Sequence, residues 1–174
     1  MKQVKLLIAI MLVFAAGTWL ACSKSSNDSN SNTQLKIRLT DNPYNATEVN
    51  VDIQKVRVNF RDDSTGWKDL NTHAGIYNLL ALQNGVDTLL AYDTVPAGVL
   101  KEIRFVLGSR NSIKIDSTVY PLTIPSGSES GLKIKLSKQL HAQLDSVIID
   151  FDAALSILKT GAGDYKLKPV LKIK

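Results

Sequence analysis

The 174-residue chain has little of the side-chain chemistry on which metal sites and many enzymes depend. It contains one cysteine and two histidines, His73 and His141, and neither histidine has a second His or Cys at metal-ligand spacing. A single cysteine excludes a disulfide within the chain, and the histidine spacing gives no basis for a zinc or iron site. We expect both histidines to be solvated at the surface rather than to act as catalytic bases.

Catalytic and phosphate-binding motifs are missing as well. The serines do not form a Gly-x-Ser-x-Gly elbow between a strand and a helix. The stretch "GAGDYKLK" (161–168) lacks the Lys-Ser/Thr pair of a phosphate loop, so we predict a hairpin turn there. Aromatic residues make up 6% of the chain. Trp67 and Tyr44 fall in predicted loops, where they could pack at one end of a core or form a stacking platform for sugar rings.

Charge gives no sign of a nucleic-acid partner. The chain has 21 Lys and Arg residues against 16 Asp and Glu, and the positive residues are spread along the sequence. Nucleic-acid binding is typical of chains whose basic residues cluster on one face. We therefore expect no nucleic-acid partner, and no motif calls for a cofactor.

The longest uncharged run lies at the N-terminus, and its apolar stretch from Leu6 to Leu20 follows two lysines. It is shorter than the roughly 20 residues that cross a bilayer as a helix, and this layout is typical of a secretory signal peptide. Cys22 follows Leu20-Ala21, which resembles the bacterial lipobox, although Trp19 stands where that pattern usually has Leu. We therefore predict a signal peptide over residues 1–21 and a lipid anchor, including palmitate, on Cys22.

A Ser/Asn-rich stretch follows the cysteine, and we predict that residues 22–34 form a flexible tether. Together with the lipobox it indicates a cell-envelope protein held at a membrane, with the outer membrane as the expected one. Acidic residues just after the cysteine tend to mark surface lipoproteins in Bacteroidota-type bacteria. Ser23-Lys24-Ser25-Ser26 contains none, so the periplasmic and the surface face of that membrane both stay open.

From Leu35 onward, apolar and polar residues alternate, as in strands that bury one face. The apolar sets are Leu35, Ile37 and Leu39; Ile103, Phe105 and Leu107; Leu132, Ile134 and Leu136; Val147, Ile149 and Phe151; and, in one final strand, Tyr165, Leu167, Leu171 and Ile173. The alternation changes phase at Gln54-Lys55, which predicts either a bulge or a bend into a second sheet. The short apolar stretches 76–82 and 153–158 could each be a helix or a strand.

Turn residues separate these runs, and Asp116-Ser117 predicts a tight hairpin. About eight strands with short connections predict an all-β fold for residues 35–174, an antiparallel β-sandwich of immunoglobulin-like or transthyretin-like type.

Three blocks of sequence resemble one known family. They are "LKIRLTDNPYNATEVNVDIQKVRV" at the start, "NLLALQNG" with "VPAGVLKEIRFVLG" in the middle, and "IDFDAALSILKTGAGDYKLKPVLKI" at the end. They resemble a bacterial lipoprotein domain, common in Bacteroidota, that is catalogued as a domain of unknown function with the number 4382. The resemblance implies a β-sandwich and an envelope location, and it implies no catalytic residues.

The carboxylates form the one group of residues whose spacing suggests a metal or catalytic site. Asp150 and Asp152 are two residues apart, so a strand would project both from its non-core face. With Asp41 or Glu48 they could supply oxygen ligands for Ca²⁺ or an acid/base pair. The alternative interpretation is that these aspartates bind backbone amides at bends.

Lysine-bearing strands and repeated Asp-Ser/Thr pairs are two further features. "LKIRL", "LKIKL" and "YKLKPVLKIK" put cations on polar faces, where an anionic glycan or lipid head group could bind, or where lysines only discourage edge aggregation. Five Asp-Ser/Thr pairs that are followed by Val, Leu or Thr resemble the acceptor motif of envelope O-glycosylation in Bacteroidota, although such pairs also favour turns. The candidate acceptors are Ser64, Thr88, Thr94, Ser117 and Ser146.

Together these features predict a non-catalytic, lipid-anchored envelope protein with a binding, adhesion or structural role. Its expected partners are the membrane, through the lipid anchor, and an envelope protein or a glycan. The alternative is a glycan-processing hydrolase that uses a carboxylate pair around Asp150 and Asp152.

Overall fold

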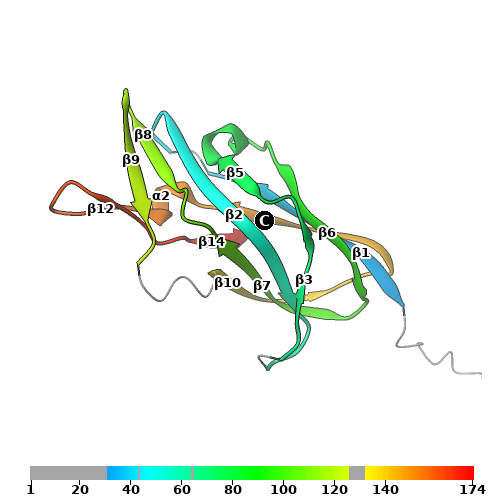
Figure 1. The fold of residues 1–174 in the computed structure, drawn as a ribbon. Helices are drawn as coiled ribbons and strands as arrows, with labels where there is room; N and C mark the ends of the chain where they lie inside the picture. The colour runs from blue at the N-terminus through cyan, green and yellow to red at the C-terminus, as the bar shows by residue number, and fades with distance from the viewer. Residues whose placement is uncertain (1–30, 43, 64, 126–131) are drawn as a thin grey trace, which may run out of the picture.

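The computed structural model describes residues 31–42, 44–63, 65–125 and 132–174, and nearly all regular structure in them is β-strand (Figure 1). The longer strands are β1 (Asn32–Thr40), β2 (Glu48–Asn59), β6 (Thr88–Pro96), β7 (Val99–Leu107), β10 (Leu132–Gln139) and β11 (Gln143–Phe151). The shorter strands are β3 (Trp67–Asp69), β4 (Asn71–Thr72), β5 (Gly75–Asn78), β8 (Ser112–Ile115), β9 (Thr118–Thr123), β12 (Ile157–Lys159), β13 (Tyr165–Leu167) and β14 (Leu171–Ile173). Two single-turn helices, η1 (Leu79–Leu82) and α2 (Ala153–Ser156), complete the described elements.

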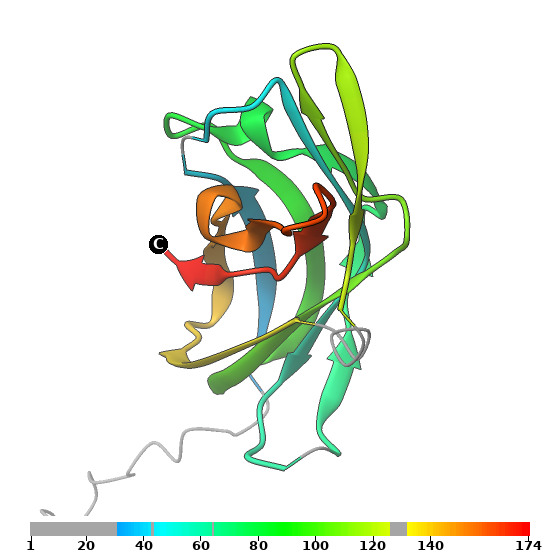
Figure 2. The same ribbon diagram turned by 90° about the vertical axis from the view of Figure 1, so that its left-hand side faces the viewer.

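The strands form two sheets that pack face to face, which confirms the predicted all-β sandwich (Figures 1 and 2). The first sheet has the order β14-β11-β1-β6-β4. The second has the order β10-β7-β2-β8-β9-β13-β12, with β3 and β5 also paired to β2. Strand β1 begins at Asn32, three residues before the predicted domain boundary at Leu35.

The predicted antiparallel sandwich of about eight strands needs two corrections of detail. Strand β1 pairs with β11 in parallel, and β13 pairs with β9 in parallel, so both sheets are mixed. Alternation of apolar residues is the same in both pairings, so it carries no information on strand direction. The strand number is larger because eight described strands have only two to six residues, too few for a periodic pattern.

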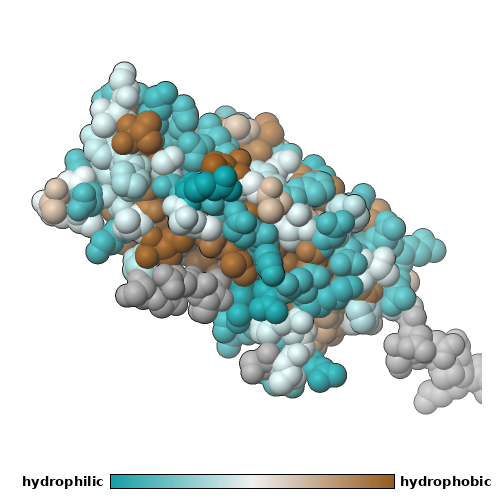
Figure 3. Space-filling model, viewed as in Figure 1, coloured by the Kyte–Doolittle hydropathy of each residue, from teal (hydrophilic) through white to brown (hydrophobic). Residues whose placement is uncertain are grey.

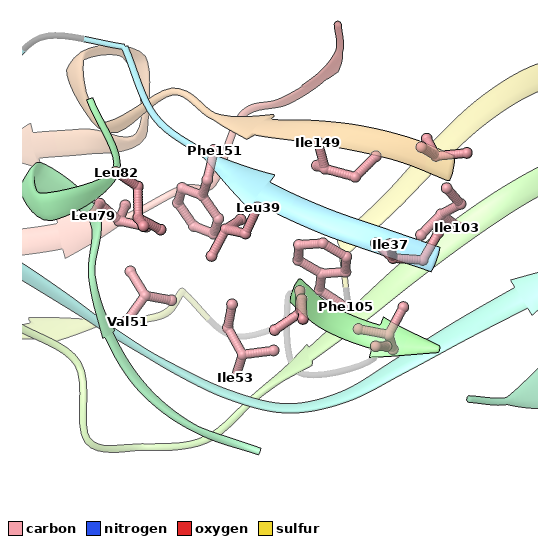
Figure 4. Packing of buried hydrophobic residues seen from close by; sticks show 14 of the residues in the cluster. Ile37, Leu39, Val51, Ile53, Leu79, Leu82, Ile103, Phe105, Ile149 and Phe151 are labelled. Carbon is pink, nitrogen blue, oxygen red and sulfur yellow. The ribbon is translucent and has the colours of Figure 1, made fainter. Parts of the chain in front are cut away.

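The hydrophobic core lies between the two sheets (Figure 4). Most of the alternating apolar side chains of β1, β7 and β11 are at most 2% exposed, as the sequence predicts: Leu35, Ile37, Leu39, Ile103, Phe105, Val147, Ile149 and Phe151. Leu107, predicted with them at the end of β7, is only half-buried. On β10 the same pattern gives only half-buried side chains at Leu132, Ile134 and Leu136. The reason is that β10 is the edge strand of the second sheet, so it has a neighbouring strand on one side only.

The phase change in β2 is a bulge. The pairing of β2 with β7 shifts register between Ile53 and Lys55, and β2 stays in the second sheet throughout. The extra residue returns Val56 and Val58 to the core face, where both are fully buried. A bulge is therefore confirmed, and a bend into the other sheet is not observed.

The two short apolar stretches for which the sequence left both a helix and a strand open each contain one of each. Residues 76–82 divide into strand β5 and helix η1, and residues 153–158 divide into helix α2 and strand β12. The predicted single C-terminal strand is wrong. It is two strands, because β13 belongs to the second sheet and β14 to the first, and the chain crosses between them at Lys168-Pro169-Val170. Pro169 suits this crossing, since it has no N–H to donate to a ladder.

Both predicted hairpins are confirmed. Strands β8 and β9 pair antiparallel around Asp116-Ser117, with Asp116 in the left-handed region at φ 52°. Strands β12 and β13 pair antiparallel around residues 160–164, where Gly163 has φ 91°. Glycine tolerates that backbone conformation without steric cost.

An ion pair between a buried carboxylate and an exposed arginine connects β2 to the loop after β7. Asp52 on β2 is 2% exposed, and its carboxylate accepts hydrogen bonds from Arg110 Nε at 2.9 Å and Nη2 at 3.1 Å. These bonds lower the pKa of Asp52. The backbone N–H of Asp52 also donates to Asn111 Oδ1 at 2.9 Å, and its carbonyl accepts from the Gly108 N–H at 2.8 Å. This ion pair was not predicted from the sequence.

Within residues 31–42, 44–63, 65–125 and 132–174, no helix is long and apolar enough to cross a membrane. The predicted signal peptide, Cys22 and most of the tether lie outside the described residues.

Candidate functional site

The three candidate calcium ligands do come together, at the end of the first sheet where β1 and β11 run side by side. The parallel register pairs Thr40 with Asp150, so Asp41, the next residue, emerges beside the end of β11. Asn42 Nδ2 bridges the other two carboxylates, donating to Asp150 Oδ2 at 2.7 Å and to Asp152 Oδ2 at 3.4 Å. The sequence therefore predicted this neighbourhood correctly. Glu48, the other candidate, instead pairs with Lys114 at 3.2 Å.

The carboxylates are not arranged as a strand would place them. Strand β11 ends at Phe151, and Asp152 is the N-cap of helix α2, where its Oδ1 accepts from the Leu155 N–H at 3.0 Å. Asp41 Oδ1 accepts from the Ala153 N–H at 2.9 Å. Two of the three aspartates thus bind backbone amides at the β11–α2 bend, which is the local-bonding interpretation.

Lysines of the C-terminal strand neutralise two of these carboxylates. Lys172 Nζ lies 2.7 Å from Asp152 Oδ2, and Lys174 Nζ lies 3.7 Å from Asp150 Oδ2. Burial would raise the pKa of Asp152, but hydrogen bonds from Lys172, Leu155 and other donors outweigh that effect and lower it. An ammonium group at these oxygens occupies the place that a cation would take.

Asp41 differs from its neighbours. Burial is the largest effect on it and raises its pKa from the ordinary 3.8 to about 6, although hydrogen bonds from Ala153 and Gln83 oppose this. The negative charge of Asp150 raises it further. Asp41 is 1% exposed and has no lysine partner among the described residues.

The geometry of this cluster does not favour a metal site or a substrate site. Among the described residues, no group of three or more His, Cys, Asp or Glu side chains could hold a metal ion. Asp41, Asp150 and Asp152 are each less than 5% exposed. They do not line either of two surface hollows, one of about 540 Å³ beside Leu107 and Ile124 and one of about 220 Å³ beside Lys101 and Lys135.

The two histidines lie at the surface, as expected. His73 is exposed between β4 and β5, and its ring meets the Tyr92 ring edge-on at a centroid distance of 5.8 Å. The His141 side chain is 80% exposed, and its Nδ1 lies 3.1 Å from Asp145 Oδ2.

The outer face of the second sheet carries a group of cations, of which the lysine-bearing strands in the sequence indicated only Lys133 and Lys135. We call it the cationic face and define it as Lys55, Arg57, Arg104, Lys133 and Lys135. Cross-strand pairing places them together: Lys133 lies opposite Arg104, and Arg104 lies opposite Arg57. Their neighbours along these strands, Ile103, Phe105, Val56 and Val58, point into the core, so the cations point outward. Figure 3 shows hydrophilic side chains over the region where β2, β3 and β7 meet.

Trp67 lies against this face. The Arg104 guanidinium carbon is 4.1 Å from the Trp67 ring centroid, and that of Arg57 is 5.9 Å away. Contacts of this kind hold the guanidinium groups in place. Tyr44 instead packs against the hydrophobic core, and its burial raises its pKa. The two aromatics contact different residues and do not form the shared stacking platform considered from the sequence.

The lysine-rich segments divide between the two sheets. Strands β1 and β14 of the first sheet carry Lys36 and Lys172, whereas β10 and β13 of the second carry Lys133 and Lys166. These lysines therefore do not share one sheet, because β1 and β10 belong to different sheets and the C-terminal segment changes sheet after β13.

The glycosylation candidates differ in their surroundings. Ser64 and the lipidation candidate Cys22 lie outside the described residues. Thr88 begins β6 and is half-buried, while Thr94 and Ser146 are exposed within β6 and β11. Of the four described acceptors, Ser117 alone is exposed in a turn. A preference of Asp-Ser/Thr pairs for turns thus explains one of these four sites.

Comparison with known proteins gives one result. A family model described as Domain of unknown function (DUF4382) matches residues 32–169, which is most of the chain and nearly all of the sandwich. No curated protein and no solved structure matches the chain.

Proposed function

Because the chain belongs to the family Domain of unknown function (DUF4382), we propose its role from its geometry: a lipid-anchored, non-catalytic binding domain of the bacterial cell envelope. The observation that carries the binding role is the contrast between its polar groups. The candidate carboxylates Asp41, Asp150 and Asp152 are buried and accept hydrogen bonds from other groups of the protein. The side chains of the cationic face instead point outward from the second sheet.

The anchor is proposed from Cys22 and its lipobox-like surroundings. Nine residues separate Cys22 from the first strand, so Asn32 lies ten residue steps along the chain from Cys22. An extended chain spans at most about 3.3–3.6 Å per residue, so such a tether would hold the domain within about 35 Å of the bilayer. One acyl chain binds a membrane only marginally, and several chains on one cysteine would hold the protein firmly.

A glycan hydrolase built on Asp150 and Asp152 is the less favoured alternative. Glycosidases place two carboxyl groups on opposite sides of an open space that admits the sugar. Here Asn42 and Lys172 fill the space around the two carboxylates with hydrogen-bond donors. If the Asp152→Asn variant kept its fold but lost turnover of an envelope glycan, the hydrolase would be the better assignment.

Ser117 is the glycosylation candidate that its surroundings favour, because a bulky glycan must stay solvated. Intact mass spectrometry of protein from its native cell would show added hexose, and Ser117→Ala would remove it. A mass equal to that of the lipidated polypeptide would end this hypothesis.

The role as an anchored binding domain is tested in the native cell. Wild-type protein and the Cys22→Ser variant would be labelled with a palmitate analogue, and the membrane fraction would then be compared with the soluble fraction. We expect label and membrane retention in the wild type only. In-cell crosslinking of the tagged wild-type protein would then identify what it contacts. Equal membrane retention of both proteins without label would contradict the anchor.

A further inference from the structure

The cationic face has a regular geometry. Neighbouring strands lie about 4.8 Å apart, so Lys133, Arg104 and Arg57 form a row about 10 Å long across three strands. Lys135 lies two residues along β10 from Lys133, about 7 Å away, and belongs to a second row opposite Glu102. The result is a two-dimensional array of positive charge on a rigid sheet.

The array has more positive than negative charge. Its carboxylates are Asp69, which pairs with Arg57 and lies 3.4 Å from Lys55 Nζ, and Glu102. Arg104, Lys133 and Lys135 have no carboxylate within 4.0 Å in the part of the chain that the structure describes. An excess of three positive charges is therefore available to an anionic ligand.

Protection of a sheet edge does not explain this array. Lysines on an exposed edge strand discourage pairing with another chain, and Lys133 and Lys135 on β10 fit that role. Arg57 and Arg104 do not, because β2 and β7 have a paired strand on both sides. Cations on central strands need another reason, and the Trp67 ring that holds both guanidinium groups indicates that their positions matter.

A hollow of about 220 Å³ lies at the end of the array. Its lining includes the cations Arg61, Lys101 and Lys135, together with Asp62, Glu102, Leu136 and Ser137. Lys101 also pairs with Asp62. A ligand that lies along the rows could place one acidic group in this hollow. Such a fit requires a flexible or thin chain rather than a flat surface.

The surroundings of the array distinguish between anionic partners. A membrane-binding face combines cations with apolar side chains that enter the acyl boundary. Here Asp69 lies opposite Arg57 and Glu102 lies opposite Lys135. Val106, opposite Lys55, is the one apolar side chain directly across from a member of the cationic face in the strand pairs of the described residues, so the face lacks a set of apolar side chains that would enter a bilayer. Proteins that bind single-stranded nucleic acid offer aromatic rings to the bases, whereas Trp67 holds arginines.

We propose that the cationic face binds a linear acidic polysaccharide, a chain of sugars that carry carboxylate groups, along the Lys133–Arg104–Arg57 row. This inference rests on the proposed binding function and names its ligand class. The carboxylates of such a chain accept charge-assisted hydrogen bonds from lysine and arginine. The sugar hydroxyl groups can bond to the polar residues between the cations.

The test uses the full-length protein purified from membranes in detergent, with polygalacturonate as the probe and neutral dextran as the control polymer. The face variant replaces three exposed lysines, Lys55→Gln, Lys133→Gln and Lys135→Gln. The matched control variant removes the same charge elsewhere, with Lys36→Gln, Lys166→Gln and Lys168→Gln. Binding is measured by affinity electrophoresis at several salt concentrations, and circular dichroism checks the fold of each protein.

We expect the wild type to bind polygalacturonate but not dextran. Each lysine near an anionic surface strengthens binding about fivefold, so the face variant should bind about 100-fold more weakly. The dependence of log Kd on log salt should also become less steep by about 2 in slope. The control variant should stay within about threefold of the wild type.

Three results would overturn the inference. They are no polygalacturonate binding by the wild type, equal loss in both variants, and tighter binding to duplex DNA or to phosphatidylglycerol vesicles than to polygalacturonate. Arg104→Gln, measured alone, should also weaken binding, and no change would place the ligand elsewhere. Palmitate labelling and crosslinking do not depend on this ligand, so its failure would leave the anchored binding domain standing.

Discussion

Asp41 should make this protein less stable at neutral pH than a variant that lacks its charge. Burial raises the pKa of Asp41 from 3.8 to about 6 in the folded state, while the unfolded chain keeps the ordinary value. Between these two pKa values the folded protein binds more protons than the unfolded protein, so the free energy of unfolding falls as pH rises. Each pKa unit corresponds to 1.36 kcal/mol, so the full loss above about pH 6 is about 3 kcal/mol.

The perturbation is Asp41→Asn, which keeps the size of the side chain and removes its ionisation. The new Oδ1 can still accept from the Ala153 N–H, which lies 2.9 Å from the present oxygen. Gln83 Nε2 lies 3.4 Å from both Asp41 Oδ2 and the Asn42 carbonyl oxygen. In the variant, rotation of the Gln83 amide would form a donor–acceptor pair with the new amide and give up the long bond to Asn42. The variant should therefore lose the ionisation penalty without losing the contact to helix α2.

The assay is urea unfolding followed by circular dichroism at several values between about pH 3.5 and pH 7.5. The other carboxylates titrate in both proteins, so the difference between variant and wild type isolates Asp41. We expect a difference near zero at the acid end that grows to as much as about 3 kcal/mol in favour of the Asp41→Asn variant above pH 6. A difference that is constant with pH, or a variant less stable at neutral pH, would refute the raised pKa.

Asp145 gives a control with the opposite sign. Burial would raise its pKa, but hydrogen bonds from the His141 N–H, Lys138 and Ser146 outweigh burial and lower it to about 2. Its folded pKa lies below the unfolded value, so its stabilisation is present above about pH 4 and is lost as pH falls toward 2. Asp145→Asn should therefore cost about 2 kcal/mol at neutral pH and progressively less in acid.

Three further predictions concern packing and ion pairing, each measured by urea unfolding at neutral pH. Phe151→Ala should lower the free energy of unfolding by about 3–5 kcal/mol, because Phe151 is fully buried between the sheets. Gly108→Ala should cost about 1–3 kcal/mol, because a Cβ there would overlap the Asp52 carboxylate, whereas Gly161→Ala meets no atom within 4 Å and should be nearly neutral. Lys172→Gln should lower the free energy of unfolding by leaving the buried Asp152 carboxylate without its charged partner, and an unchanged stability would contradict that role.

The strands and the faces that they bury were predictable from the sequence, because a strand with one buried face alternates with a period of two. The bulge in β2 was predictable for the same reason, since one extra residue changes the phase of that alternation. The direction of neighbouring strands was not predictable, because β1 would show the same alternation beside an antiparallel or a parallel partner. Nor was the division between β13 and β14, where three-residue strands carry too little pattern to show a change of sheet.

The sequence predicted where the carboxylate cluster lies, but not which groups its carboxylates bind. Two end blocks of one small sandwich contain Asp41 and Asp150, and the β1–β11 pairing brings them together. What they do depends on their other neighbours. Lys172 reaches Asp152 because β14 pairs with β11 in a register that sets Lys172 opposite Asp150. No local sequence pattern encodes that register.

The cationic face shows why a binding surface on a sheet is harder to find than a catalytic motif. Its members are spread from Lys55 to Lys135, and each is an ordinary polar residue in an alternating strand. They become neighbours only through the pairing of β10, β7 and β2, and both pairings contain a register shift, one next to Lys55 and one just after Lys135. A shift of one residue in the pairing of β7 with β2 or with β10 would set Arg104 opposite Val58 or Ile134. The positive side chains would then no longer lie together on one face. The array therefore depends on the same bulges that complete the core, so a substitution that removes a bulge should lose the face and the fold together.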